Sequence, residues 1–122
     1  MDTTSYSLFN LPEWHRGIFD RLFELKFSGK DVLKLQLLKA SYKIIDENRS
    51  LKIILPDDTP KAPVNRTIPV QAAGYDKDNS PIEILLFMHK GLIDTLEIFR
   101  VDGLKIINMP KPEDFQMMTL IK

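Results

Sequence analysis

The chain has 122 residues, with 17 basic and 17 acidic side chains and no cysteine. This is the length of one ordinary domain, so residues 1–122 are expected to form a single domain. The balanced charge argues against a nucleic-acid interface, which normally has a basic surface. The lack of cysteine excludes disulfides, thiolate metal sites and thiol nucleophiles.

Two helices are predicted in the first third of the chain. Apolar side chains recur at helical spacing through residues 11–26, and Asn10 is predicted to cap this helix with Pro12 in its first turn. After the turn-like segment 27–32, a shorter helix is predicted to run to about Ala40.

Strands are predicted for most of the remainder. "YKII" (42–45) and "LKIIL" (51–55) flank a turn, and the proline-rich segment 56–67 is expected to be a surface loop. Further strands are predicted at 68–75, 82–89 and 92–101, with an edge strand at 104–109. These elements predict an α+β fold, with two N-terminal helices packed on one face of a five- to six-stranded, mainly antiparallel sheet.

The predicted strand 92–101 is the most informative segment, because charges are spaced along an apolar run. Strand alternation separates its side chains into two sets: Leu92, Asp94, Leu96, Ile98 and Arg100, and Ile93, Thr95, Glu97, Phe99 and Val101. We expect the helices to cover Leu96 and Ile98, and Asp94 and Arg100 to reach water near the strand ends.

Glu97 is then predicted at mid-strand on the uncovered face of the sheet, across from Leu85 or Phe87. A charged side chain on a partly apolar face is suited to docking another protein. The alternative is a solvated Glu97 beside a cross-strand lysine.

Four aspartates fall in predicted loops: Asp57, Asp58, Asp76 and Asp78. Exposed turn formation is their ordinary role. As a partner-binding site, they would form an acidic rim that resembles nucleic-acid phosphates and meets the basic active site of a nuclease.

No pattern of catalytic or cofactor-binding residues stands out. The five glycines are too dispersed for a phosphate loop, and His15 and His89 lie in different predicted elements without zinc-site spacing. We therefore expect no cofactor, no metal and no enzymatic activity. A hydrolase that uses carboxylates near His89 is a minor alternative.

Three stretches resemble a family of small bacterial proteins: "FSGKDVLKLQLLKASYKI" (27–44), "SLKIIL" (50–55) and "PIEILLFMHKGLIDTLEIFRVDGLKIINMPKPEDF" (81–115). The last follows the LxxLEIxRxDG hairpin pattern of that family, with Ile93 at the position of its first leucine. The residues that carry the resemblance are Phe27, Gly29, Gln36, Leu37, Gly91, Leu96, Glu97, Ile98, Asp102, Gly103 and Pro110. Lys90 stands where an acidic residue is more usual, and "DENRS" replaces a cysteine-rich turn, so properties tied to those cysteines do not carry over.

Proteins of this kind resemble, in size and in lack of catalytic residues, the immunity proteins encoded beside polymorphic and contact-dependent growth inhibition toxins. The resemblance implies a non-catalytic cytosolic protein that binds and neutralises a cognate toxin domain. A small self-associating structural or regulatory domain is the alternative, with a homodimer formed through the open sheet face or the edge of strand 104–109. No signal peptide or membrane-spanning run is visible, so a cytoplasmic location without nucleic-acid or membrane partners is expected.

Overall fold

The structure is a computed structural model that describes residues 4–121. It contains two α-helices, α1 (Glu13–Leu22) and α2 (Lys30–Lys39), and two short 3-10 helices, η1 (Leu8–Asn10) and η2 (Pro112–Asp114). The strands are β1 (Tyr6–Ser7), β2 (Ser41–Ile44), β3 (Leu51–Ile54), β4 (Val70–Tyr75), β5 (Pro81–His89), β6 (Leu92–Arg100) and β7 (Gln116–Thr119). Residues 1–3 and 122, which the single-domain prediction includes, lie outside the described residues.

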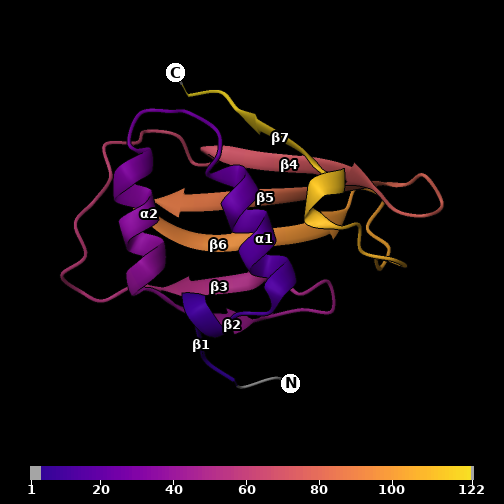
Figure 1. Ribbon diagram of the computed structural model, residues 1–122, viewed down its shortest axis with the longest axis horizontal. Helices are drawn as coiled ribbons and strands as arrows, with labels where there is room; N and C mark the ends of the chain where they lie inside the picture. The colour runs from indigo at the N-terminus through magenta and orange to yellow at the C-terminus, as the bar shows by residue number, and fades with distance from the viewer. Residues whose placement is uncertain (1–3, 122) are drawn as a thin grey trace.

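One antiparallel sheet holds all seven strands, in the order β1-β2-β3-β6-β5-β4-β7 (Figure 1). The predicted α+β class and antiparallel pairing are confirmed, but the predicted number of five to six strands is too low. The two additional strands, β1 and β7, are short and form the sheet edges. Strands of two and four residues contain too few positions to show a clear alternation in sequence.

The prediction of an edge strand at 104–109 is wrong, because this segment is an irregular loop. The backbone amides of Ile107 and Asn108 donate to the carboxylate of Asp76, at 2.7 and 2.9 Å. Amides that are bound to a side chain cannot form a strand ladder, although the apolar pattern of the segment suits one.

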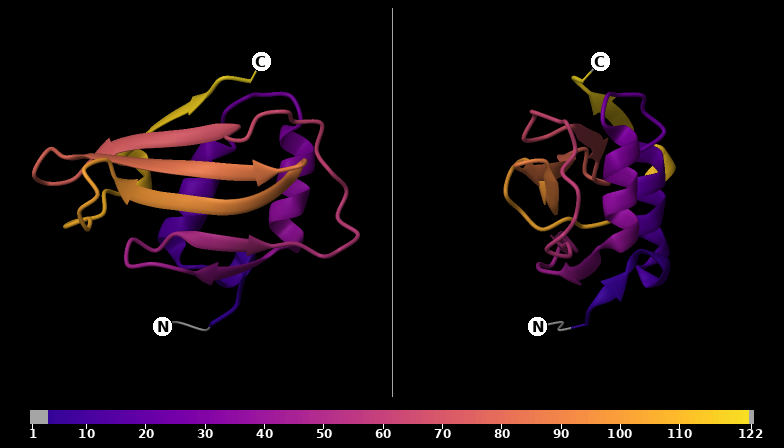
Figure 2. Two further views of the ribbon diagram at one scale, coloured as in Figure 1. Left: turned by 180° about the vertical axis from the view of Figure 1, so that it is seen from behind. Right: turned by 90° about the vertical axis from the view of Figure 1, so that its left-hand side faces the viewer.

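Both α-helices lie on the same side of the sheet, and in the part of the chain that the structure describes the other side carries no helix (Figure 2). The apolar stripe of α1 is buried through Ile18, Phe19 and Leu22, and α2 buries Leu33 and Leu37. The core between the helices and the sheet is completed by aliphatic side chains of the three central strands, including Ile82, Ile84, Leu86, Leu96 and Ile98.

The first α-helix begins later than predicted, and Asn10 is not its N-cap. Pro12 occupies the cap position, while the Asn10 side chain accepts a 2.6 Å hydrogen bond from the amide of Ser7 within η1. Proline restricts the residue before it to extended conformations, which separates the η1 turn from α1 at Leu11.

The β5–β6 hairpin turns at Lys90 and Gly91, both with positive φ, as the glycine predicted. Met88 pairs with Ile93 and Phe87 with Thr95, so Asp94 is an extra residue in β6. The bulge shifts the alternation of side chains by one residue, so the predicted face is wrong for Ile93, which lies on the buried face together with Leu96.

A buried glutamine ties α2 to this hairpin and to the loop 56–67. The side-chain amide of Gln36 donates to the carbonyls of Pro60 and Gly91, at 3.0 and 2.9 Å. Its oxygen accepts a 3.0 Å hydrogen bond from the amide of Ile93. Gln36 therefore satisfies three backbone groups where regular structure is interrupted.

Candidate functional site

The side of the sheet opposite the two α-helices faces the viewer in the left view of Figure 2. Its side chains are a mixture of apolar and charged residues. We call it the open sheet face and define it by Lys52, Glu83, Leu85, Phe87, Thr95, Glu97 and Phe99. Glu97 is exposed and pairs in register with Leu85, as predicted. Three half-buried apolar side chains surround it on this face: Leu85, Phe87 and Phe99.

Glu97 is solvated, as the alternative interpretation predicts, but within residues 4–121 it forms no ion pair with a cross-strand lysine. The lysine on the neighbouring strand, Lys52, instead binds Asp94 at 2.7 Å, and Thr95 donates to the same carboxylate. The hydrogen bond from Lys52 lowers the pKa of Asp94, while partial burial opposes the shift. Within residues 4–121, Glu97 has no ion-pair partner, so its charge is available to another molecule.

A shallow hollow of about 340 Å³ lies beside Glu97 on the same face. Its lining includes His89, Asp94 and Glu97, so the structure gathers the residues of the minor hydrolase alternative in one place. Asp94 is already bound to Lys52 and Thr95, as described above. Among residues 4–121, no three His, Asp or Glu side chains are arranged to hold a metal ion.

The four aspartates proposed as an acidic rim are not gathered at one place. Asp57 and Asp58 are exposed and follow β3, at the end of the sheet where β5 turns into β6. Asp76 and Asp78 lie between β4 and β5 at the opposite end of the sheet (Figure 1). Antiparallel strands carry these two loops to opposite ends, so the aspartates cannot form one rim.

Asp76 is buried, which corrects its assignment as an exposed partner-binding residue. Its carboxylate accepts the amides of Ile107, Asn108 and Lys77 and pairs with the guanidinium of Arg100 at 3.1 Å. Burial raises the pKa of Asp76, but these four donors outweigh it and bring the pKa to about 2.

Arg100 is also buried, which overturns the expectation that it reaches water at the strand end. It pairs with Asp78 at 3.2 Å and with Asp102 at 2.6 Å, in addition to Asp76. The hydrogen bond to Asp102 raises the pKa of Arg100 although burial opposes it, and the amide of Ser80 is the main cause of a lowered pKa at Asp78. A guanidinium has enough donors to bind several carboxylates, so this cluster fastens the loop after β6 to the turn after β4.

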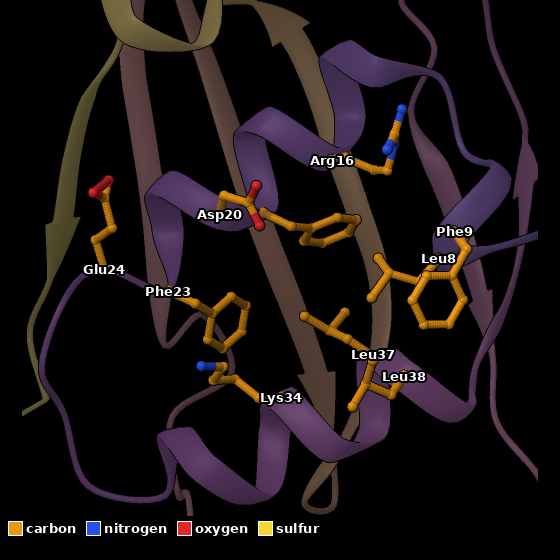
Figure 3. Close-up of a pocket in the computed structure, with 10 residues that line it drawn as sticks. Leu8, Phe9, Arg16, Asp20, Phe23, Glu24, Lys34, Leu37 and Leu38 are labelled. Atoms are coloured by element: carbon orange, nitrogen blue, oxygen red, sulfur yellow. The ribbon is translucent and has the colours of Figure 1, made fainter.

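A second hollow lies on the opposite side of the molecule, between the helices (Figure 3). We call it the helix groove; its volume is about 550 Å³. Its apolar lining comes from η1, α1 and α2: Leu8, Phe9, Phe19, Phe23, Leu37 and Leu38. Its charged lining is Arg16, Asp20, Glu24 and Lys34. Sequence reasoning missed this groove, because it depends on how far apart the two helices pack.

His15 is buried on α1, where its Nε2 forms a 2.8 Å hydrogen bond with the carbonyl of Arg49 and its Nδ1 has no partner within the described residues. Burial lowers the pKa of His15 below 6.5, and the bond to Arg49 only partly offsets this shift. The unfolded chain therefore binds a proton at a higher pH than the folded chain does.

We expect the free energy of unfolding to be constant above about pH 7 and to fall as the pH drops through 6.5, since protonation of His15 favours the unfolded state. Urea titrations between pH 7.5 and 5.5 measure this slope, in a range where the carboxylates stay ionised. His15→Gln should flatten the slope, and His89→Gln, at an exposed position, should preserve it. An equal slope in the wild type and His15→Gln would contradict the prediction.

The fold and the site define an α+β antiparallel-sheet protein with two separate mixed surfaces, one on the sheet and one between the helices. No protein-family model matches the chain, and neither the curated proteins nor the solved structures include a significant match. Among residues 4–121, no helix has both the length and the apolar character needed to cross a lipid bilayer.

Proposed function

We propose that this chain is a non-catalytic, cytosolic protein-binding domain, and in its most specific form an immunity protein that occludes a cognate bacterial toxin domain. The observation that carries the proposal is the open sheet face, where Glu97 lies among half-buried Leu85, Phe87 and Phe99 and has no ion-pair partner within residues 4–121. Protein interfaces commonly combine an apolar centre with a few charges that select the partner.

The charge on this face defines the chemistry of the partner. An anion that loses its water needs a cation in return, so the partner should present Arg or Lys opposite Glu97 and apolar side chains around it. A nuclease with a basic active site meets this requirement. Of the four loop aspartates, only Asp57 and Asp58 stay candidates for an additional contact, because Asp76 is buried and Asp78 is paired with Arg100.

The family resemblance supports the proposal mainly through the fold. Gln36 binds three backbone groups. Gly91 has a positive φ, and any larger residue there would place its Cβ only 2.9 Å from the Ala62 carbonyl oxygen. Glu97 differs from these two residues of the shared pattern, because its side chain has no ion-pair partner within residues 4–121. A binding role would explain its presence.

Glu97→Lys should abolish protection in cells that co-express the chain with a toxin encoded by the adjacent upstream gene. Reversing a charge at the centre of an interface typically weakens binding by 2 kcal/mol or more, which is roughly 30-fold or more in Kd. Glu113→Lys is the matched control, since Glu113 is exposed on η2 away from the open sheet face. If the chain gave neither a complex nor protection, or if both variants protected equally, the proposal would be wrong.

The stoichiometry of protection separates this proposal from the hydrolase alternative. An occluding inhibitor must be present in at least equimolar amount with the toxin, whereas an enzyme acts at a small fraction of that amount. Titration of purified chain against toxin activity should therefore end near one to one. The His89→Ala variant should keep this end point.

A self-associating domain is the second candidate function, favoured by the exposed apolar side chains around the helix groove. The edge of strand 104–109 can no longer serve as the contact, because that segment is a loop.

A further inference from the structure

The helix groove has an exposed apolar side chain beside an apolar recess. Phe9 on η1 is 76% exposed and Leu38 on α2 is 49% exposed. Both line the groove, whose inner wall includes the buried rings of Phe19 and Phe23. A surface that carries both a projecting ring and a recess lined by rings can be complementary to itself.

Charged side chains line both walls of the groove, and the α1 wall carries Arg16 as well as two acidic residues. Asp20 and Glu24 lie on the α1 side and Lys34 on the α2 side (Figure 3). Within residues 4–121, neither Asp20 nor Lys34 has an ion-pair partner, so they do not bind each other across the groove. Arg16, the remaining charged residue, donates its Nε to the carbonyl of Leu11 at 3.1 Å.

We infer that a second copy of this chain covers the groove, in a two-fold symmetric homodimer whose axis runs along the groove. This symmetry places α1 of each copy over α2 of the other, so Asp20 of one copy meets Lys34 of the second copy twice. Phe9 and Leu38 are buried at the same time. The inference deepens the self-association candidate, and it leaves the open sheet face free because that face is on the other side of the sheet (Figure 2).

The length of the helices limits the strength of this dimer. Each α-helix has 10 residues, which is roughly 15 Å of helix. The contact is therefore at the small end of specific interfaces, and such interfaces bind weakly. We expect dissociation in the micromolar range.

Sedimentation velocity from about 1 to 500 μM tests the inference on the purified chain. The wild type should pass from monomer to dimer with rising concentration, and Leu38→Asp should raise the Kd by roughly 30-fold or more. Leu104→Asp is the matched control, because Leu104 is 62% exposed in the loop after β6, outside the groove. A wild type that stays monomeric, or an equal effect of the two variants, would overturn the inference.

Exchanging the charges tests the symmetry itself. Asp20→Lys alone and Lys34→Asp alone should each weaken the dimer, because like charges then meet at both contacts. An equimolar mixture of the two variants should dimerise again, because each contact then joins Lys at position 20 or 34 to Asp. Failure of the mixture to dimerise, with both variants folded by circular dichroism, would refute this arrangement.

The open-face variant Glu97→Lys separates this inference from the proposed immunity function. It should dimerise as the wild type does while losing toxin protection. A dimer that Glu97→Lys breaks and Leu38→Asp spares would assign self-association to the sheet instead and refute the groove.

Discussion

Replacing Asp76 with asparagine is expected to lower the melting temperature by about 10–20 °C. Each oxygen of this carboxylate accepts two hydrogen bonds. Oδ1 accepts from the amides of Lys77 and Asn108, and Oδ2 accepts from the amide of Ile107 and the guanidinium of Arg100. The side-chain NH₂ of asparagine would face two of these donors in either orientation. The substitution also removes one charge from a buried ion pair, a change that costs several kcal/mol in measured proteins.

Asp78→Asn is the matched control, because Asp78 also pairs with Arg100 but its side chain is 42% exposed, whereas that of Asp76 is fully buried. Exposed ion pairs contribute little, and asparagine can still accept the amide of Ser80 through Oδ1. Thermal unfolding followed by circular dichroism measures both variants. Similar decreases in melting temperature for the two variants would contradict a special role of Asp76 in holding the loop 104–109.

Protonation of the Asp76 carboxylate should lower the free energy of unfolding at acid pH. Its pKa of about 2 lies below the usual value of 3.8, so its contribution to stability is complete above about pH 4. The contribution is lost as the pH falls from there towards 2, since the unfolded chain takes up the proton first. The Asp76→Asn variant should lack this part of the acid transition.

Gln36→Leu is expected to reduce the free energy of unfolding by about 2–4 kcal/mol. The substitution leaves the Ile93 amide, inside the protein, without an acceptor, and it removes the donor to the Pro60 carbonyl. Leucine is close in volume to glutamine, so the loss reports the missing hydrogen bonds rather than a cavity. Urea unfolding monitored by the fluorescence of Trp14 measures the change.

The loss of this tie should also loosen the loop 56–67, where Gln36 holds the carbonyl of Pro60. Hydrogen exchange should accelerate at Ala62, whose amide donates to Gly91 in the same region. Gln71→Leu is the control, since Gln71 lies half-buried on β4 and its side chain forms no hydrogen bond of this kind within residues 4–121. A Gln36 variant as stable as the Gln71 variant would contradict the prediction.

The sequence by itself determined the secondary structure where the apolar pattern is long and regular. Both α-helices, the β2–β3 hairpin and the strands β4, β5 and β6 lie at or near their predicted positions. Glu97 was also placed correctly, on the uncovered face across from Leu85. These features depend on local periodicity and on turn residues such as Gly91, both of which are visible over a few residues.

Only the tertiary structure decided the roles of the charged and polar residues. In the sequence, Asp76 looks like an exposed turn former and Arg100 like a residue at a strand end. Their burial and pairing arise only in the fold, which brings the two side chains to 3.1 Å from each other. The Asp76 carboxylate also accepts hydrogen bonds from the amides of Ile107 and Asn108, so an apolar segment that suits a strand forms a loop. The helix groove likewise exists only because two separate helices pack side by side. Burial and pairing of a charge depend on residues distant in the chain, and no local pattern encodes that proximity.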